Sequence, residues 1–515
     1  MIREASASGC CWSVRLCCEG LMIWGLEPEV CWEPLARVRT LSHATLPTAA
    51  GSTDEPSPQV GGPQPGSCLA LVILWSRDEP ERVGEITLLK APSGEPPGWT
   101  LGRGNTGDGV RTRLNFMRQR PGRNLETGPL LGRRISRVQL GLTPSDGGRI
   151  ALTAEGQRQV RLGGRVVKQA VLAPGELIEV EDELLLMLEP RSTWIQDDPN
   201  AGRHRFGYAD AFGLVGETPA AWELRRQLTF VGPRGEHALI LGASGVGKEL
   251  IAQAVHALSD RGDRPLIARN AATFPETLID AELFGNAVGY PNPGMAERPG
   301  LIGQADRGTL FLDEIGELSR ALQAHLLRVL DAGEYQRLGD SSSRRSDFRL
   351  LAATNRDPKA LKHDLRARMA ITIQVPGLEA RRADIPLLIR HLLRVIGERD
   401  PAIADRFLDE RGQPRVTPGL MSALVCRPYT AHVRELRGLL WTVMLHARGE
   451  LLEESQELRF QPEEASTGVD PSSLTRAALV SALEAAEGVR ERAWRALGLR
   501  SRHQLNRLMK KHDLT

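Results

Sequence analysis

The fold of the central region is decided by the stretch Gly242-Ala243-Ser244-Gly245-Val246-Gly247-Lys248-Glu249. It follows an apolar run, Ala238-Leu239-Ile240-Leu241, that predicts a buried strand, and it precedes residues 250–256, whose spacing predicts a helix. Strand, glycine-rich turn and helix are the setting of a phosphate-binding loop, because successive N–H groups and a helix N-terminus attract an anion. We expect Lys248 to reach the β- and γ-phosphates of a nucleotide, and the alternative is an ordinary glycine-rich turn.

Two further predicted strands end in polar residues. Residues 308–312 form an apolar run that ends in Asp313 and Glu314, and residues 348–353 form another that ends in Thr354 and Asn355. A carboxylate at such a strand end can hold Mg²⁺, and its neighbour can polarise the attacking water. We therefore expect Asp313 to bind Mg²⁺, Glu314 to activate water, and the Thr–Asn pair to sense the γ-phosphate of ATP. The alternative for the two carboxylates is a solvated acidic strand end.

These motifs occur in the order found in one protein family. The chain also contains Gly216-Glu217-Thr218-Pro219, Glu282-Leu283-Phe284-Gly285, Ala353-Thr354-Asn355-Arg356 and Val433-Arg434-Glu435-Leu436. Over residues 213–450 the sequence closely resembles the AAA+ domain of bacterial enhancer-binding proteins, the sigma-54-dependent activators. Glu249 stands where other phosphate loops have Ser or Thr, and it is normal in that family. The resemblance implies an α/β subdomain at 213–376, a helical lid at 377–452, ATP hydrolysis and a ring, most simply a hexamer.

The resemblance also implies roles for single residues. Leu214-Val215-Gly216 corresponds to the segment under the adenine, and Asn270 to the switch that holds Glu314 until ATP is bound, with a turn residue as its alternative. Arg434 corresponds to the lid arginine that reaches the phosphates, with a surface ion pair as its alternative. Arg368 corresponds to an arginine that acts on the nucleotide of a neighbouring subunit.

Two departures from the family pattern bear on function. The loop that contacts sigma-54 in the family, Gly-Ala-Phe-Thr-Gly-Ala, is here Gly289-Tyr290-Pro291-Asn292-Pro293-Gly294. Two prolines stiffen its tip and remove N–H donors, which leaves contact with sigma-54 RNA polymerase open. Lys362 replaces the first of two trans-acting arginines, and a Lys lacks the planar fork of an arginine finger. Arg366 is a spare candidate, and we expect hydrolysis to be retained.

The first 67 residues are interpreted as a disordered leader and linker, 1–67. Six of the seven cysteines lie in the first 68 residues, but their spacing fits no common zinc pattern. Residues 43–67 are rich in Pro, Gly, Ser and Thr, which is typical of a linker. No apolar run reaches the roughly 18 residues of a membrane span, and charged residues interrupt residues 1–33, so we expect a cytoplasmic protein that does not contact a membrane.

Residues 68–190 predict an all-β sandwich. The final hairpin, residues 172–188, resembles that of a forkhead-associated domain, and Arg103 and Ser136 fall in its two recognition loops. The resemblance implies that they contact a phosphothreonine, so a phosphothreonine protein or a Ser/Thr kinase is the expected partner. The family's His after Ser-Arg-x is lost and its Asn-Gly is Arg158-Gln159, and a sandwich used for self-association is the alternative. The short β-type runs that alternate with turns are Leu69–Trp75, Glu85–Leu89, Val138–Leu142, Arg149–Thr153, Gln159–Leu162 and Leu184–Leu188.

The remaining segments are two linkers, 191–212 and 453–470, and a small C-terminal domain, 471–515. Three helices are predicted there, and Leu505, Leu508 and Met509 form the apolar face of the last one. Nine Lys and Arg against four acids give the domain a net charge of +5, whereas the whole chain carries +2. It resembles the factor-for-inversion-stimulation-type helix-turn-helix that ends these activators, and a solvated helical hairpin is the alternative. The outward-facing residues expected to bind DNA are Arg502, His503, Gln504, Asn506, Arg507 and Lys510.

The sequence thus predicts an ATP-driven transcription regulator. The C-terminal domain holds an upstream DNA site, the AAA+ ring acts on sigma-54 RNA polymerase, and the β-sandwich receives a signal. One alternative is a DNA-binding regulator with nucleotide-controlled assembly that does not remodel sigma-54. Another is a phosphoprotein-binding scaffold with a vestigial ATPase, against which the intact Lys248, Asp313 and Glu314 argue.

Overall fold

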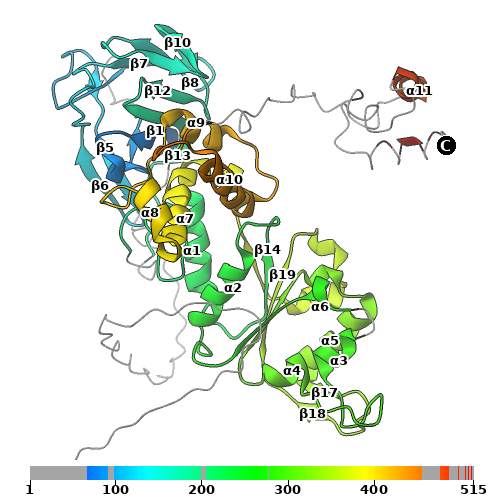
Figure 1. Cartoon of the computed structure of the whole chain (residues 1–515). Coiled ribbons are helices and arrows are strands. Elements are labelled where there is room, and N and C mark those ends of the chain that lie inside the picture. The colour runs from blue at the N-terminus through cyan, green and yellow to red at the C-terminus, as the bar shows by residue number, and fades with distance from the viewer. Residues whose placement is uncertain are drawn as a thin grey trace, which may run out of the picture. The chain divides into compact units, whose positions relative to one another are not determined.

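The structure is a computed structural model and is shown in Figure 1. It describes residues 66–90, 98–198, 204–275, 278–454 and 476–485, and the single residues 497, 505, 508, 509 and 512. The predicted leader lies outside the described residues as far as residue 65. The residues predicted to contact DNA also lie outside them: Arg502, His503, Gln504, Asn506, Arg507 and Lys510.

The N-terminal domain consists of two β-sheets that share one core. One sheet has eight strands in the order β10-β9-β12-β13-β1-β2-β5-β6, and the other has five in the order β11-β8-β7-β3-β4. The strands are β1 (Ser67–Ser76), β2 (Ile86–Leu88), β3 (Trp99–Leu101), β4 (Thr112–Arg113), β5 (Phe116–Arg120), β6 (Arg123–Gly128), β7 (Leu140–Ser145), β8 (Arg149–Ala154), β9 (Val160–Leu162), β10 (Arg165–Val167), β11 (Gln169–Leu172), β12 (Leu177–Val180) and β13 (Leu184–Ser192), with a 3-10 turn η1 (Pro80–Arg82). Every run predicted from the sequence overlaps a strand.

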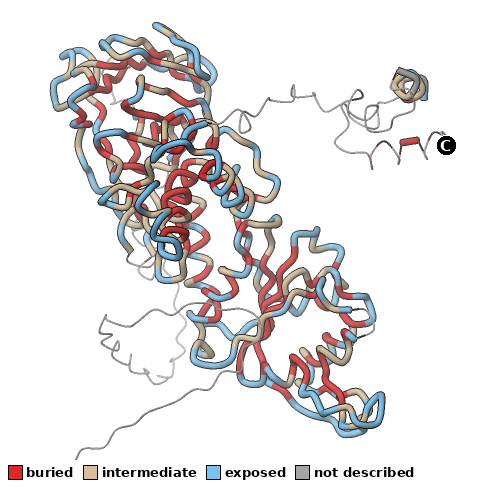
Figure 2. Tube along the Cα trace, in the orientation of Figure 1, coloured by how far each residue is buried: buried red, intermediate tan, exposed pale blue. Residues whose placement is uncertain are grey.

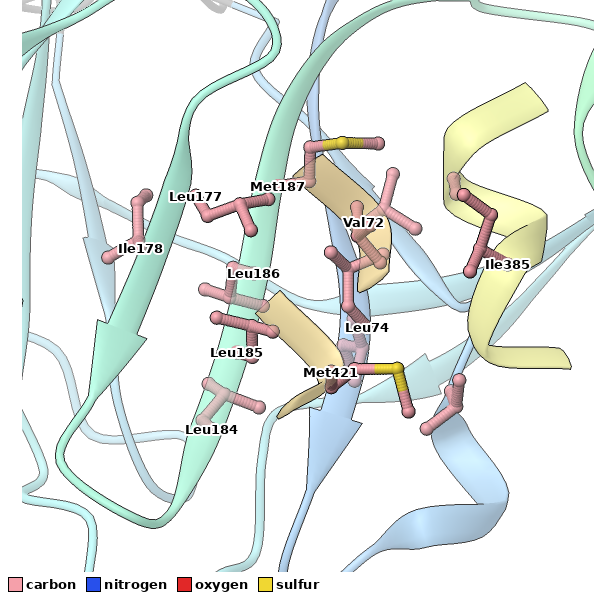
Figure 3. Close-up of a cluster of buried hydrophobic side chains, with 14 of the residues drawn as sticks. Val72, Leu74, Leu177, Ile178, Leu184, Leu185, Leu186, Met187, Ile385 and Met421 are labelled. Atoms are coloured by element: carbon pink, nitrogen blue, oxygen red, sulfur yellow. The ribbon is translucent and has the colours of Figure 1, made fainter. Parts of the chain in front are cut away.

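Strands β1 and β13 are buried on both of their faces. They pair antiparallel from Ser67↔Ser192 to Ser76↔Leu184, and residues 70–74 and 184–188 are buried without interruption. An antiparallel strand with one solvated face alternates buried and exposed residues, so unbroken burial means that both faces are covered. Figure 3 shows what covers the second face, because side chains of β1 and β13 lie there beside Ile385 and Met421 of the helical lid.

The AAA+ α/β subdomain is built on a parallel sheet in the order β15-β16-β19-β14-β20. Its strands are β14 (Ala238–Leu241), β15 (Leu266–Asn270), β16 (Thr309–Asp313), β19 (Arg349–Thr354) and β20 (Ile371–Gln374). The three strands predicted from the sequence are present, and their near-continuous apolar runs fit a parallel sheet covered on both faces. Leu241 pairs with Thr354 and Asn270 with Asp313, so the predicted site residues gather at one edge of the sheet.

Helices cover this sheet and form the lid that follows it. Three α-helices of the described residues begin at a proline, and the preceding Thr218, Asp400 and Thr417 cap them by accepting a backbone N–H. Figure 2 shows burial concentrated on the strands and on the inner faces of the helices. The α/β subdomain contains α1 (Pro219–Val231), α2 (Lys248–Ala257), η2 (Ala271–Thr273), α3 (Ile279–Phe284), α4 (Gly300–Gln304), η3 (Ile315–Glu317), α5 (Arg320–Ala332), η4 (Pro358–Ala360), α6 (His363–Arg368) and the hairpin β17 (Glu334–Tyr335) and β18 (Arg344–Arg345). The lid contains η5 (Leu378–Asp384), α7 (Ile385–Arg399), α8 (Pro401–Phe407), α9 (Pro418–Cys426) and α10 (His432–His446).

Of the predicted C-terminal helices, the described residues contain α11 (Arg476–Ala485). Leu479 of α11 is buried together with Leu505, Leu508 and Met509, which are the residues predicted to form the apolar face of the last helix. Among the described residues no helix has the length and hydropathy needed to cross a membrane.

Candidate nucleotide site and β-sandwich loops

The loop predicted to bind phosphate has the backbone geometry of an anion site. It joins β14 to α2, and Gly245 and Gly247 adopt φ angles of +80° and +104°, which residues with a side chain rarely adopt. Gly247 is the N-cap of α2, so the unpaired N–H groups of the first helical turn face the loop. Val246 anchors the loop in the core below it, and a Cβ at Gly242 would lie only 2.9 Å from the Val246 side chain.

The charged residues of the loop and of the β16 end form one cluster. The Lys248 ammonium lies 3.2 Å from Glu314 Oε1 and also donates to the Gly242 carbonyl at 3.2 Å. Glu314 adopts a left-handed φ of +51°, and its N–H donates to Asp313 Oδ1 at 3.0 Å. Burial raises the pKa of Asp313, and the charge of Lys248 partly offsets that rise. The three groups that the sequence assigned to phosphate, Mg²⁺ and water therefore lie side by side.

The ends of β19 and β15 lie next to this cluster. The Asn355 N–H donates to Glu314 Oε2 at 3.2 Å, and the Thr354 carbonyl accepts from the Gly242 N–H at 3.3 Å. Asn270 is in register with Asp313, but its Oδ1 accepts from the Ala272 N–H at 2.8 Å. The Glu314 carboxylate is thus held by Lys248 and Asn355 in this structure, whereas the predicted switch residue caps a turn beside it.

The lid meets the phosphate loop at the start of α10. The Val433 N–H donates to the Gly245 carbonyl at 3.1 Å, and Arg434 Nη1 donates to Ser244 Oγ at 3.2 Å. A Cβ at Gly245 would lie 2.1 Å from the Ala431 carbonyl, so glycine is required for this approach. The predicted lid arginine therefore lies at the phosphate loop.

The residues predicted to act in trans lie on α6. Arg368 ends that helix, its side chain is 54% exposed, and its Nε lies 2.7 Å from Asp331 Oδ1 of α5. Lys362, which replaces the family's first arginine, is the N-cap residue of the same helix. Within one chain Arg368 makes a surface ion pair with Asp331. Because the Arg368 side chain is exposed, a group on a neighbouring copy could replace Asp331 as its partner.

The loop that differs from the family, Gly289–Gly294, has an exposed tip on a fixed base. Asn286 is buried beneath it, and its Nδ2 donates to three backbone carbonyls at 3.0, 3.2 and 3.1 Å. Tyr290 packs against Gly339 between β17 and β18, where a Cβ on the glycine would lie 2.5 Å from the ring. The aromatic ring that follows Gly289 therefore lies against the neighbouring hairpin.

The two predicted recognition loops of the β-sandwich are brought together. The Arg103 N–H donates to the Ser136 carbonyl at 2.9 Å, and Ser136 Oγ accepts from the Gln157 N–H at 3.0 Å. Gln139 is fully buried, and it stands where the resemblance to a forkhead-associated domain leads one to expect a His. Its Oε1 accepts from the Ser136 N–H at 3.3 Å, and its Nε2 donates to the Arg158 carbonyl at 2.8 Å. Gln139 thus ties the second recognition loop to the loop that carries Arg158.

Sequence reasoning missed the polar residues that join the domains. Arg120 of β5 pairs with Glu217, which lies 97 residues further along the chain, and Asp384 of the lid accepts three hydrogen bonds from Glu217 and Thr218. Residues so far apart form no local spacing pattern. Glu217 and Thr218 stand in the motif Gly216–Pro219 that carries the family resemblance, but no pattern in the sequence pairs them with Arg120 or Asp384.

The phosphate loop, the paired carboxylates and the parallel sheet define an AAA+ P-loop NTPase. Residues 214–377 match the family described as the sigma-54 interaction domain. The transcriptional regulatory protein ZraR of Salmonella typhimurium is 35% identical over 313 residues, which are 58% of this chain and 69% of that one. The Nif-specific regulatory protein of Azotobacter vinelandii is 36% identical over 325 residues, which are 58% of each chain. The solved structure of NtrX from Brucella abortus in complex with ADP has a TM-score of 0.43 at 27% identity and covers 59% of this chain and 69% of that chain. This chain belongs to the family of sigma-54-dependent AAA+ transcriptional regulators.

Proposed function

We propose that this chain uses ATP hydrolysis by an AAA+ ring to act on sigma-54 RNA polymerase from an upstream DNA site. The observation that carries the proposal is the cluster of Lys248, Asp313 and Glu314 below the phosphate loop. These residues have the chemistry that phosphate, Mg²⁺ and an attacking water require, and they lie together at one edge of the sheet. A scaffold with a vestigial ATPase has no use for a base, so the intact cluster favours a working enzyme.

Hydrolysis requires Glu314 to change its partner. Glu314 Oε1 lies 3.2 Å from the Lys248 ammonium. A γ-phosphate carries more negative charge than a carboxylate and draws Lys248 toward itself, which frees this oxygen to accept a proton from the attacking water. The Asn355 N–H, bonded to the other oxygen, keeps the carboxylate oriented. ATP binding thereby prepares the base.

Asp313 fits the requirements of a magnesium ligand. Its carboxylate is half-buried at the end of β16, next to the phosphate loop. Mg²⁺ is commonly held by one or two carboxylates together with substrate phosphates and water, so a single Asp is enough. Mg²⁺ bound here would neutralise phosphate charge, while Asp313 also orients the Glu314 backbone through its 3.0 Å hydrogen bond.

A ring of identical subunits completes the proposed active site. Arg368 is exposed on α6 and pairs with Asp331 of its own chain. In a ring, its planar guanidinium would reach the nucleotide of the adjacent subunit and stabilise the charge that spreads over the phosphoryl oxygens. A hexamer is the simplest ring for an AAA+ subunit.

In this proposal the C-terminal domain binds the DNA site, and the β-sandwich receives the signal. Residues 471–515 carry a net charge of +5, which favours a DNA backbone. The adjoining loops carry Arg103 and Ser136, and a guanidinium and a hydroxyl are groups that bind a phosphothreonine. A phosphothreonine protein or a Ser/Thr kinase is therefore the proposed partner of the β-sandwich.

ATP turnover and promoter opening by the full-length chain test the proposal. We expect ATP hydrolysis by the wild type, its loss in Glu314→Gln, and ATP-dependent open-complex formation with sigma-54 RNA polymerase. Absence of hydrolysis in the wild type contradicts the ATPase assignment. Hydrolysis without open complexes supports the second candidate function.

The second candidate is a DNA-binding regulator with nucleotide-controlled assembly that does not remodel sigma-54. The loop Gly289–Gly294 favours it, because Pro291 and Pro293 offer no N–H donors and the Tyr290 ring lies against Gly339. This candidate predicts DNA binding and ATP turnover without promoter opening.

A further inference from the structure

The segment Leu214–Thr218 belongs to two hydrophobic cores at once. Leu214 is buried with Val246 of the phosphate loop and Ile251 of α2. The next residue, Val215, is buried in the cluster formed by the β-sandwich and the lid. Neighbouring residues of this segment thus lie in two different cores, so the segment separates the core beneath the phosphate loop from the sandwich–lid interface, and we call it the wall.

Three parts of the chain hold the backbone of this wall. Arg225 of α1 donates to the Leu214 and Gly216 carbonyls, both at 2.8 Å. From the lid, Asp384 Oδ1 accepts from the Glu217 and Thr218 N–H groups at 2.7 and 3.1 Å, and its Oδ2 accepts from the Thr218 hydroxyl at 2.5 Å. Gly216 has a φ of +139°, and a Cβ there would lie 2.5 Å from the Asp384 carboxylate. The α1 helix and the lid therefore fix one side of the wall.

The β-sandwich fixes the other side through two arginines. Arg120 Nη2 donates to Glu217 Oε1 at 2.9 Å, and Arg191 Nη2 donates to the Glu217 carbonyl at 2.9 Å. The Gly207 N–H donates to the same Oε1 at 2.7 Å. Arg120, Arg191 and Glu217 are 8%, 3% and 2% exposed, so these contacts are made in a nearly dry environment where charge interactions are strong.

The pKa of the Glu217 carboxyl group depends on Arg120 of the β-sandwich. Burial alone raises the pKa of a carboxyl group, but in Glu217 the imidazole of His204, whose Nε2 lies 3.7 Å from Oε1, and the charge of Arg120 outweigh burial and lower the pKa. Its Oε2 has no hydrogen-bond partner among the described residues. Removing Arg120 therefore leaves the buried Glu217 carboxylate with less positive charge beside it, within the wall Leu214–Thr218.

We infer that Arg120 and Arg191 of the β-sandwich are positioning residues for the nucleotide, because through Glu217 they fix the wall Leu214–Thr218 beside the phosphate loop. This inference rests on the proposed ATPase function. The β-sandwich is then a structural part of the nucleotide site, and its state sets the affinity for ATP. By thermodynamic reciprocity, ATP in turn changes the affinity of the sandwich for whatever binds it.

A binding experiment on the full-length chain tests this inference. The probe is a fluorescent ATP analogue, whose Kd is measured together with kcat and KM for ATP. We expect Arg120→Met to raise Kd and KM about tenfold, within the range of couplings carried through packed networks, with kcat within about twofold of the wild type. The control is Arg161→Met on strand β9, because Arg161 pairs with Glu179 and Glu181 inside the sandwich, and the Kd of this variant should stay within about twofold of the wild type.

The outcomes separate the inference from the function on which it rests. A wild-type Kd in folded Arg120→Met overturns the inference. If Arg120→Met does not fold, Glu217→Gln removes the charge at constant size, and we expect a Kd raised about threefold; a wild-type Kd in that variant overturns the inference equally. A wild-type chain that fails to bind the analogue contradicts the proposed ATPase function instead.

Discussion

The two sites proposed to bind phosphate in this chain are built by different means. The loop Gly242–Lys248 lies at the edge of a parallel sheet, and its lysine is buried against Glu314 and the loop's own backbone. The β-sandwich site consists of two exposed loops held together by the Arg103–Ser136 backbone hydrogen bond and by the buried Gln139. The first site takes its geometry from a local motif, and the second takes it from a side chain buried beneath the loops.

This difference determines how each site tolerates change. Backbone amides and glycine conformations make the first site sensitive to single substitutions, since a Cβ at Gly245 already meets the Ala431 carbonyl at 2.1 Å. In the second site Gln139 links the loops, because its amide offers both a donor and an acceptor. We therefore expect this site to depend more on Gln139 than on the backbone conformation of the loops.

Replacing Arg368 with Ala tests the largest difference between the two proposed sites, because only the proposed nucleotide site takes an arginine from a second chain. We expect kcat for ATP to fall by about 10³-fold, in the range of arginine-finger losses, with phosphopeptide binding unchanged. Steady-state hydrolysis measures the loss. Arg366→Ala on the same helix is the control, and a larger loss there would transfer the role to Arg366.

Replacing Glu314 with Gln separates binding from chemistry at the nucleotide site. We expect kcat to fall by about 10²- to 10⁴-fold, the usual contribution of a general base. ATP affinity should be retained or increased, since Lys248 no longer pairs with a carboxylate. Single-turnover hydrolysis and equilibrium nucleotide binding measure the two effects. Loss of ATP binding would mean that Glu314 holds the loop together.

Replacing Arg103 with Ala tests the sandwich site. A hydrogen bond to a charged group is worth about 1.5–3 kcal/mol, so the Kd for a phosphothreonine peptide should rise about 10- to 100-fold. Fluorescence anisotropy with a labelled peptide measures it. Arg165→Ala, on the exposed strand β10, is the control. Equal effects of the two substitutions would indicate nonspecific charge attraction.

Replacing Gln139 with Leu tests whether the buried side chain supports the loops. Two bonded backbone groups lose their partner, at a cost of about 1–3 kcal/mol for each buried group left unsatisfied. We expect a lower thermal midpoint and a several-fold loss of phosphopeptide affinity, with ATP turnover kept. Gln139→His, the residue of the family pattern, should restore part of the affinity. A Leu variant with wild-type stability would rule out this supporting role.

Much of the nucleotide site could be predicted from the sequence. The strands β16 and β19 are apolar runs that end in Asp313 and Thr354, Gly242 directly follows β14, and parallel pairing alone brings these strand ends to one edge of the sheet. The wall that carries Glu217 could not be predicted in the same way. Its partners Arg120, Arg191 and Asp384 come from three distant segments, and their pairing is decided by how the sandwich and lid pack.

The sequence of β1 and β13 already indicates that both faces of these strands are buried. An antiparallel strand that is apolar at every position requires a cover on both faces, and Leu69–Trp75 and Leu184–Leu188 have that composition. The identity of the cover, the lid with Ile385 and Met421, came only from the structure. Short strands such as β3 and β4 have too few residues for an alternation pattern to stand out.

Capture of sigma-54 by the full-length chain tests the central claim most directly. The chain is incubated with ADP and a metal fluoride, which mimics the transition state of phosphoryl transfer, and bound sigma-54 is measured against ADP alone. We predict capture that depends on the metal fluoride and disappears in Lys248→Ala. A protein that hydrolyses ATP but retains no sigma-54 under these conditions would contradict the claim and would support the regulator that does not remodel sigma-54.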